Sequence, residues 1–224
     1  ITDHIGLAPS ITAASSYTPD LSGLPTTTND DYVFLCVSAA VTSGTLSVSG
    51  SGWVEEIELD VTLGCRMAVY YCKVASGTVA TPTITLSAGS GMWQCVAWVE
   101  RDADATDPVD NSASVNPGSA VTSMTSATLT PGTDNCRVIY FATTRASGSS
   151  SQLRMLESDA IGEVLQDIND GSVYTSVSIG SVMQGTAAAT AKTVYINGTG
   201  KWSGVITFAI KNKASGKRAR YATP

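Results

Sequence analysis

The sequence predicts an all-β protein: an antiparallel, jelly-roll-like β-sandwich of about 10–12 strands with at most one short helix. Two observations lead to this class. Short runs rich in Val, Ile, Thr, Tyr and Trp recur along the 224 residues, and clusters of Gly, Pro, Asn and Ser separate them. Turns fall about every 8–12 residues, which is typical of a sandwich or barrel. We expect one domain over residues 1–224, because sandwiches of this length are common as single units.

The expected elements follow one another along the chain in a simple order. Residues 1–25 are polar and contain proline, and we expect them to run as an extended N-terminal arm. Residues 101–124 are predicted to form a long crossing loop. Strands are predicted over 32–38, 45–49, 53–61, 66–74, 82–87, 92–100, 125–130, 136–143, 173–183, 192–196 and 202–211.

One stretch, residues 151–170, is compatible with two structures. Apolar residues from Ile161 to Ile168 fall at helical spacing. Gly162 disfavours a helix by about 1 kcal/mol relative to Ala. We therefore favour two short strands here, with one short helix as the alternative.

The predicted strand 53–61 shows the clearest alternation. Ile57 and Leu59 are expected to face the core, with Glu56, Glu58 and Asp60 on the solvent side. Paired carboxylates are also the usual signature of a glycosidase. A catalytic acid would need burial to raise its pKa, and the alternation favours a solvated strand face instead.

A Gly-rich turn precedes a Trp at three places: GSGW (50–53), GSGMW (89–93) and GTGKW (198–202). Gly supplies the positive φ that tight turns require. The Trp that follows opens a strand and can cover an end of the sandwich with a large apolar area. We interpret the recurrence as a structural device and not as a sequence repeat.

The composition describes a surface of short, uncharged side chains. Hydrophobic residues make up 43% of the chain, enough for a core, and charged residues only 14%. Ser and Thr carry a smaller desolvation penalty than Lys or Glu when a neighbour covers them, so this surface suits contact. The net charge of −6 argues against a nucleic-acid partner, and no apolar run is long enough for a membrane span.

Basic residues are concentrated at the end of the chain. The last fourteen positions contain no acid. The segment 211–224 is either a solvated terminus or a tail that docks on an acidic neighbour. For the second interpretation the partner-binding candidates are Lys211, Lys213, Lys217, Arg218 and Arg220.

The cysteines and the single histidine argue against a zinc site and against nucleophilic catalysis. No two cysteines are spaced as CxxC, and the one histidine, His4, lies in the expected arm. A Ser or Cys nucleophile needs a rigidly held base, and a histidine in an extended arm is not expected to be held rigidly. Phosphate-binding glycine motifs are absent too. We expect no enzyme activity, no cofactor, and free thiols folded in a reducing cytoplasm: Cys36, Cys65, Cys72, Cys95 and Cys136.

The acidic loop RDADATDPVD is the remaining metal candidate. Asp102 and Asp104 begin like an EF-hand loop. The pattern then fails, since Asp107 stands where the sharp turn needs Gly and Ala113 replaces the bidentate Glu. A solvated loop with Asx turns is favoured, and Asp102, Asp104 and Asp107 remain weak calcium candidates.

Several segments together resemble a known family. They are DYVFLCV, GSGW, RMAVYYCKVASGTVATPTITLS, WQCVAWVERDADATDPVD and KWSGVITFAIK, in this order. The chain resembles, over about residues 28–212, a sandwich domain that recurs in tailed-phage structural gene modules. None of these motifs is catalytic. The polar segment 112–128 and the tail after 211 depart from the pattern.

The resemblance implies a virion protein of the capsid decoration or cement, head-fibre or tail-associated type. The leading expectation is a non-enzymatic decoration protein that binds the outer shell of the capsid. Its partners would be the major capsid protein or other virion proteins, with a homotrimer by analogy, and it would be made in the host cytoplasm.

Two alternatives stay open. One is a receptor-binding module of the tail or fibre, present in few copies. The other is a carbohydrate-binding module, which would display coplanar exposed aromatics to bind a glycan. The four tryptophans lie in apolar runs, where core packing is the favoured role: Trp53, Trp93, Trp98 and Trp202.

Overall fold

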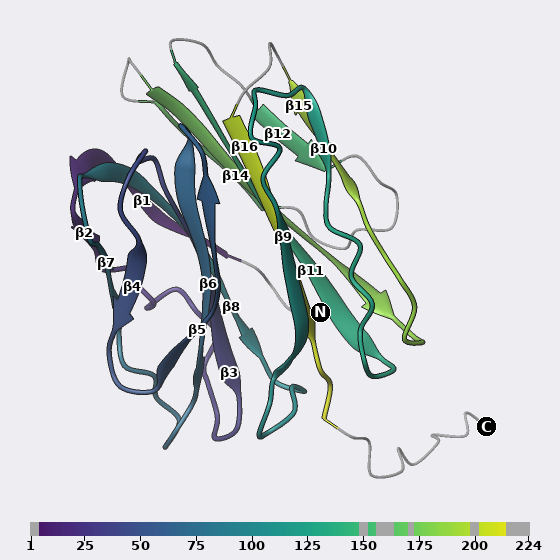
Figure 1. The fold of residues 1–224 in the computed structure, drawn as a ribbon. Helices are drawn as coiled ribbons and strands as arrows, with labels where there is room; N and C mark the ends of the chain where they lie inside the picture. The colour runs from purple at the N-terminus through teal and green to yellow at the C-terminus, as the bar shows by residue number, and fades with distance from the viewer. Residues whose placement is uncertain (1–4, 148–151, 156–163, 170–172, 198–201, 214–224) are drawn as a thin grey trace.

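The computed structural model describes residues 5–147, 152–155, 164–169, 173–197 and 202–213, and every regular element in these ranges is a β-strand (Figure 1). The predicted all-β sandwich class is confirmed. Sixteen strands are present in the described ranges, more than the expected 10–12, because the expected arm and crossing loop contain β1, β2, β9 and most of β10. Of the two structures weighed for 151–170, the structure has the two short strands.

The strands are β1 (Ile5–Ala14), β2 (Ser16–Tyr17), β3 (Tyr32–Ala39), β4 (Leu46–Ser49), β5 (Trp53–Val61), β6 (Cys65–Lys73), β7 (Thr83–Leu86), β8 (Gly91–Glu100), β9 (Val109–Val115), β10 (Ser123–Thr125), β11 (Cys136–Ser147), β12 (Gln152–Met155), β13 (Val164–Asn169), β14 (Val173–Gln184), β15 (Thr193–Asn197) and β16 (Trp202–Ile210).

The strands form four antiparallel sheets. Two have five strands, in the orders β1-β8-β3-β6-β5 and β13-β14-β11-β16-β9, and two have three, β2-β7-β4 and β10-β15-β12. The five-stranded sheets pack on each other through one core, and each also packs on a three-stranded sheet through a core of its own. The three-stranded sheets therefore form outer layers on opposite sides of the stack (Figure 1).

The chain contains the same sandwich twice. Strands β1–β8 and strands β9–β16 have the same order, with β1-β8-β3-β6-β5 matching β9-β16-β11-β14-β13 and β2-β7-β4 matching β10-β15-β12. Sheets ordered 1-8-3-6 and 2-7-4 are those of a jelly roll, here with the fifth strand on the larger sheet. The expected single domain over 1–224 stays a prediction; the described residues form two similar halves with a common core.

The strand register shows which residues of the two halves are equivalent. Trp98 pairs with Phe34 in the first half, and Phe208 pairs with Ile139 in the second. Extending both registers along the central strands makes Ser38 of β3 equivalent to Thr143 of β11. In addition β1 lies against β13 and β5 against β9, as a two-fold relation between the halves requires.

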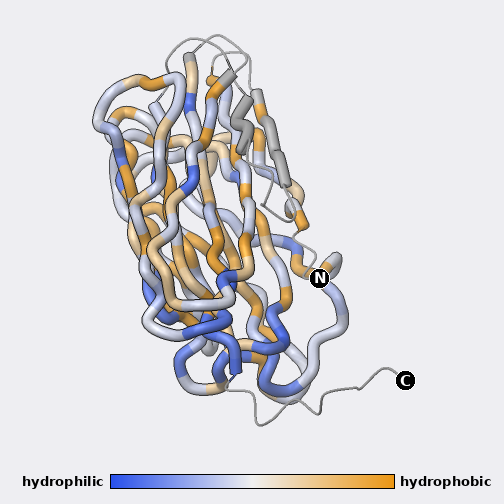
Figure 2. Tube along the Cα trace, turned by 90° about the vertical axis from the view of Figure 1, so that its right-hand side faces the viewer, coloured by the Kyte–Doolittle hydropathy of each residue, from blue (hydrophilic) through white to orange (hydrophobic). Residues whose placement is uncertain are grey.

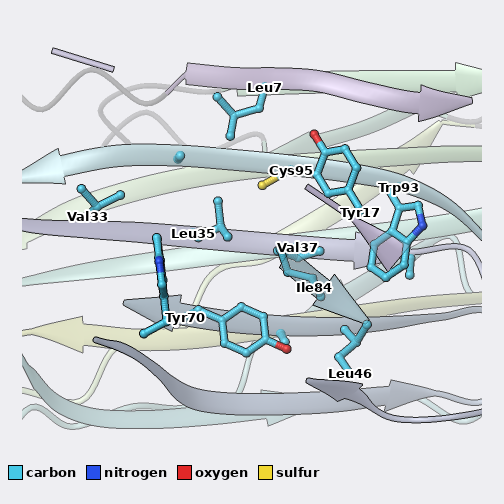
Figure 3. Packing of buried hydrophobic residues seen from close by; sticks show 14 of the residues in the cluster. Leu7, Tyr17, Val33, Leu35, Val37, Leu46, Tyr70, Ile84, Trp93 and Cys95 are labelled. Carbon is cyan, nitrogen blue, oxygen red and sulfur yellow. The ribbon is translucent and has the colours of Figure 1, made fainter. Parts of the chain in front are cut away.

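The first half has an aromatic core between its two sheets (Figure 3). Leu35, Tyr70 and Trp93 point into this layer, and the rings of Tyr17 and Trp93 stack 5.9 Å apart. The Trp93 indole N–H donates to the Ala14 carbonyl at 3.0 Å, so the buried ring keeps its polar group satisfied.

The first Gly-Trp turn has the predicted structure. Gly50 and Gly52 have positive φ, and Trp53 behind them is buried with its indole N–H donating to the Ala80 carbonyl at 2.7 Å. Trp202 is half-buried and packs against the core between the halves. Residues 198–201 of the third turn lie outside the described ranges.

Two expectations about irregular segments are wrong. Residues 5–17 of the expected arm are β1 and β2, which pair with β8 and β7. The expected crossing loop 101–124 contains β9 and most of β10, while the strand expected over 125–130 is limited to Thr125 and one bridge at Leu129. These strands bury few side chains because they lie at sheet edges, and β1 carries Pro9 and two register shifts.

Candidate functional site

The carboxylates of β5 serve the fold. A register shift between Glu55 and Ile57 leaves Ile57 facing the central core, as predicted, but Glu56 and Glu58 are half-buried and not freely solvated. Glu58 accepts a hydrogen bond from the Leu46 N–H at 2.7 Å and so satisfies a backbone group of β4. Burial raises the pKa of Glu56. The hydrogen bond to Leu46 gives Glu58 a role within the fold.

The acidic loop forms an Asx turn. One carboxylate oxygen of Asp104 accepts from the Thr106 N–H at 3.0 Å, the Thr106 hydroxyl at 2.8 Å and the Asp107 N–H at 3.1 Å. These hydrogen bonds, the Thr106 N–H first, lower the pKa of Asp104 to about 2. In the described ranges no three His, Cys, Asp or Glu side chains come together as metal ligands, and the structure does not bring Asp102, Asp104 and Asp107 into such a group.

The start of the basic tail is tied to the same loop. The Asp104 N–H donates to the Lys211 carbonyl at 2.8 Å, and the Lys213 N–H donates to the Asp102 carbonyl at 2.5 Å. Residues 211–213 therefore cross the connection between the two halves. The other partner-binding candidates, Lys217, Arg218 and Arg220, lie outside the described residues, as does His4.

One ion pair is buried between the two halves. Arg137 of β11 binds Glu100 of β8 with 3.0 Å between Nη1 and Oε2, and both side chains are less than a tenth exposed. The Trp98 indole N–H donates to the same oxygen at 3.3 Å, and Arg137 also donates to Ser181 at 3.1 Å. Burial raises the pKa of Glu100 although Arg137 opposes the shift. The pair joins the two halves.

All five cysteines are free, as predicted, and all of them are buried. Burial raises the pKa of the Cys36 and Cys95 thiols well above the usual value and that of Cys65 to about 11. A thiol with a raised pKa in a closed core is a poor nucleophile.

The described part of the chain holds no helix of the length and apolar character needed to cross a membrane.

The outer face of the β2-β7-β4 sheet carries hydroxyl groups at its outward positions. Tyr17, Ile84 and Leu46 point inward to the core, so the residues that alternate with them point outward. β4 and β7 each contribute two Ser or Thr residues, and β2 contributes one together with Thr18, which directly follows it. None of these six positions carries a charge. We call this surface the hydroxyl face; its residues are Ser16, Thr18, Ser47, Ser49, Thr83 and Thr85.

The sequence carries a signal for this face. The motifs SYT (16–18), SVS (47–49) and TIT (83–85) all have the form hydroxyl–apolar–hydroxyl. Each motif alone predicts only a half-buried strand. The pairings of β7 with β2 and with β4 are needed to place the three motifs side by side.

A hollow opens at one end of the hydroxyl face. Its volume is about 540 Å³, and it lies between segment 18–22 and segment 78–81. Thr18 belongs both to the hollow and to the hydroxyl face, and its hydroxyl lies 3.0 Å from that of Thr83. Leu21 and Val79 give the hollow apolar walls, and the exposed Asp20 also lines it.

The opposite outer sheet is different. Its outward hydroxyl residues in β10 and β15 are Ser123, Thr125 and Thr193. The hydroxyl oxygens of Thr125 and Thr193 lie 3.2 Å apart. Tyr195, at the position equivalent to Thr85, is 45% exposed. Among the residues that the structure describes, the most hydrophilic stretches lie in loops at one end of the molecule (Figure 2).

The fold and these surfaces define a tandem jelly-roll protein in which the charged groups described above make structural contacts. Comparison with protein-family models, with curated proteins and with solved structures finds no match to the chain.

Proposed function

We propose that this chain is a non-enzymatic structural protein of a tailed-phage virion, a capsid decoration or cement protein that binds the outer shell. The resemblance of the strand motifs to phage structural modules suggests the virion. The observation that carries the proposal is the hydroxyl face, an uncharged outer layer of a rigid four-layer stack. Short hydroxyl side chains can be covered by a neighbour at a small desolvation penalty, which suits a permanent contact.

The arrangement of layers supports a bridging role. The two three-stranded sheets lie on opposite sides of the stack, so two neighbours can be contacted at once (Figure 1). The shared core between the halves, closed by the stacked rings of Phe34, Trp98 and Phe208, makes the stack a stiff spacer. Stiffness matters for a cement because a compliant link would transmit little force between neighbours.

The test compares virions made with and without this chain. We expect many copies per head, and we expect heads that lack the chain to rupture at a lower temperature or osmotic shock. Restoring the chain in trans is the control for loss of another product. Unchanged head stability would refute the cementing role. Only a few copies per particle, located at the tail, would support the receptor-binding alternative instead.

A further inference from the structure

The two five-stranded sheets face each other across the core between the halves, and we call the two surfaces that meet there the inner faces. The first lies on β3, β5, β6 and β8, and the second on β11, β14 and β16. The two-fold relation between the halves makes β3 equivalent to β11 and β8 equivalent to β16. Two positions on the inner faces break this relation, one by charge and one by size.

The Glu100–Arg137 ion pair breaks the relation by charge. In the first half Glu100 pairs with Tyr32 in the strand register. In the second half the equivalent pair is Ile210 with Arg137, in that order. The symmetric counterpart of the ion pair is therefore Tyr32 with Ile210, two residues buried in the core between the halves. One side of the two-fold axis carries a buried ion pair where the other side carries uncharged side chains.

Gly204 breaks the relation by size. Its register partner on β11 is Thr143. Gln94 has the equivalent partner, Ser38 on β3, so Gln94 and Gly204 occupy equivalent positions. A Cβ on Gly204 would lie 2.5 Å from Val61 Cγ2 of the facing sheet. A Gln side chain is larger than a methyl group, so Gln94 would overpack this contact if it stood in the place of Gly204.

Two first halves are poorly matched to each other through these faces. If the first half of a second copy took the place of the second half, Tyr32 would stand where Arg137 stands. Glu100 would then be buried without a countercharge. Gln94 would stand where Gly204 stands and would overpack the contact with β5. A two-fold axis repeats each fault, so both faults occur twice.

Two second halves meet a different fault. Ile210 of the second copy would stand where Glu100 stands, so Arg137 would be buried without a carboxylate. A guanidinium keeps its charge inside a protein, so it does not escape this penalty by losing a proton. Pairing of a first half with a second half avoids all of these faults.

We propose that the two inner faces select each other and reject themselves, and that the Glu100–Arg137 pair and Gly204 set this specificity. The partner of each inner face is the other half of this chain, and a like half of a second copy is excluded. This specificity comes from faults in the wrong pairs and needs no additional affinity in the right one. It prevents copies at high local concentration from joining through like inner faces. The proposal concerns how the chain closes on itself and does not depend on the proposed function.

A variant with matched inner faces tests the proposal. Gln94→Gly, Glu100→Ile and Arg137→Tyr each introduce the residue found at the equivalent position of the other half, and the matched variant combines all three. Asp30→Asn with Lys73→Met is the control, since it also removes an ion pair, but an exposed one within the first half. Thermal unfolding of the intact chains checks that each variant is folded.

Every chain in the test carries an inserted protease site between Thr106 and Asp107, which are exposed in the connection between the halves. The folded chain is cut there, and its two pieces are kept together, unfolded in denaturant and refolded. Native mass spectrometry then measures the ratio of unlike pairs to like pairs, which is about one for pairing without selection. For the parent and the control we expect a ratio of at least about ten, and for the matched variant a ratio at least about fivefold lower.

A parent ratio of about one would overturn the proposal. A matched variant as selective as the parent would overturn it too, because these residues would not set the specificity. Parent pieces that do not recombine would have the same consequence, because the halves would then need the connection to recognise each other. Glu100→Ile with Arg137→Tyr, which keeps Gln94, is the second variant should the matched one not fold. Removing the charge fault alone should still lower the ratio below that of the parent.

Discussion

Ser38 and Thr143 occupy equivalent positions in the two halves of the fold and hydrogen-bond to each other, with 2.9 Å between Oγ and Oγ1. Both side chains are buried. Equivalent residues that touch lie on the axis relating the two halves, as in an isologous dimer interface. A second equivalent pair, Trp98 and Phe208, also meets there, with ring centroids 6.3 Å apart. The halves of this single chain therefore meet as the subunits of a two-fold dimer do.

The Ser38–Thr143 contact should be measurable as a coupling energy. Replacing Ser38 by Ala and Thr143 by Val, singly and together, gives a double-mutant cycle. We expect coupling of about 0.5–1.5 kcal/mol in the free energy of unfolding from chemical denaturation, the usual net value of a hydrogen bond. Ser38→Ala combined with Thr207→Val, a buried threonine of β16, is the additive control. Zero coupling in the first cycle would contradict the contact.

The buried Glu100–Arg137 pair should be sensitive to the loss of one partner. Arg137→Met leaves the Glu100 carboxyl buried without its countercharge, and we expect the free energy of unfolding to fall by about 3–5 kcal/mol. Adding Glu100→Leu should restore most of that loss, because two apolar residues can replace a buried ion pair at little net cost. If the double variant is as unstable as the sum of the two single variants, the side chains do not act as a pair.

The raised pKa of Glu100 predicts the sign of one pH effect. Between the ordinary glutamate pKa and the higher folded pKa, the folded chain holds more protons than the unfolded chain, so this group's contribution to stability falls as pH rises. The contribution is fully present at a pH below the ordinary glutamate pKa, and it is lost as the pH rises through the pKa of Glu100 in the folded chain. Glu100→Gln removes the titration. The free energy of unfolding of the parent and of Glu100→Gln is measured between pH 4 and 7 in steps of about half a pH unit. The difference, parent minus variant, should decrease as pH rises; an increase would contradict this account.

Gly204 is required by the close approach of the two halves. A Cβ at this position would lie 2.5 Å from Val61 Cγ2 and 3.0 Å from Leu59 Cδ2, both on the facing sheet. We expect Gly204→Ala to lower the free energy of unfolding by about 1–3 kcal/mol through overpacking. Gly185→Ala, where a Cβ meets no atom within 4 Å, is the matched control and should be neutral or slightly stabilising. Equal effects of the two substitutions would argue against tight packing at Gly204.

Apolar periodicity in the sequence was enough for most of the individual strands. Runs such as 53–61 and 92–100 are long, apolar and bounded by Gly-rich turns, and the structure places β5 and β8 on them within a residue. The edge strands β1 and β9 escape this pattern because they bury few side chains and pair mainly through the backbone. For this reason the sequence predicts an arm where β1 lies and a loop where β9 lies.

The sequence analysis does not predict the duplication of the sandwich, although equivalent residues in the two halves are separated by a constant interval in parts of the chain. Met67 and Val177, and Val96 and Ile206, are equivalent pairs separated by the same interval of 110 residues. Conserved apolar character without conserved identity is weak evidence of a repeat in a sequence already rich in Val and Ile. The matching order of eight strands in each half makes the repeat plain.

The sequence by itself determined the all-β class and the packing of Trp53, Trp93 and Trp98 in the core, because these depend on local periodicity and on the transfer of apolar side chains from water. Only the tertiary structure decided that two jelly rolls stack face to face, that Glu100 meets Arg137, and that three hydroxyl motifs form one surface. Each of these is a contact between strands distant in sequence. Such contacts are set by strand pairing and sheet packing, which no local pattern encodes.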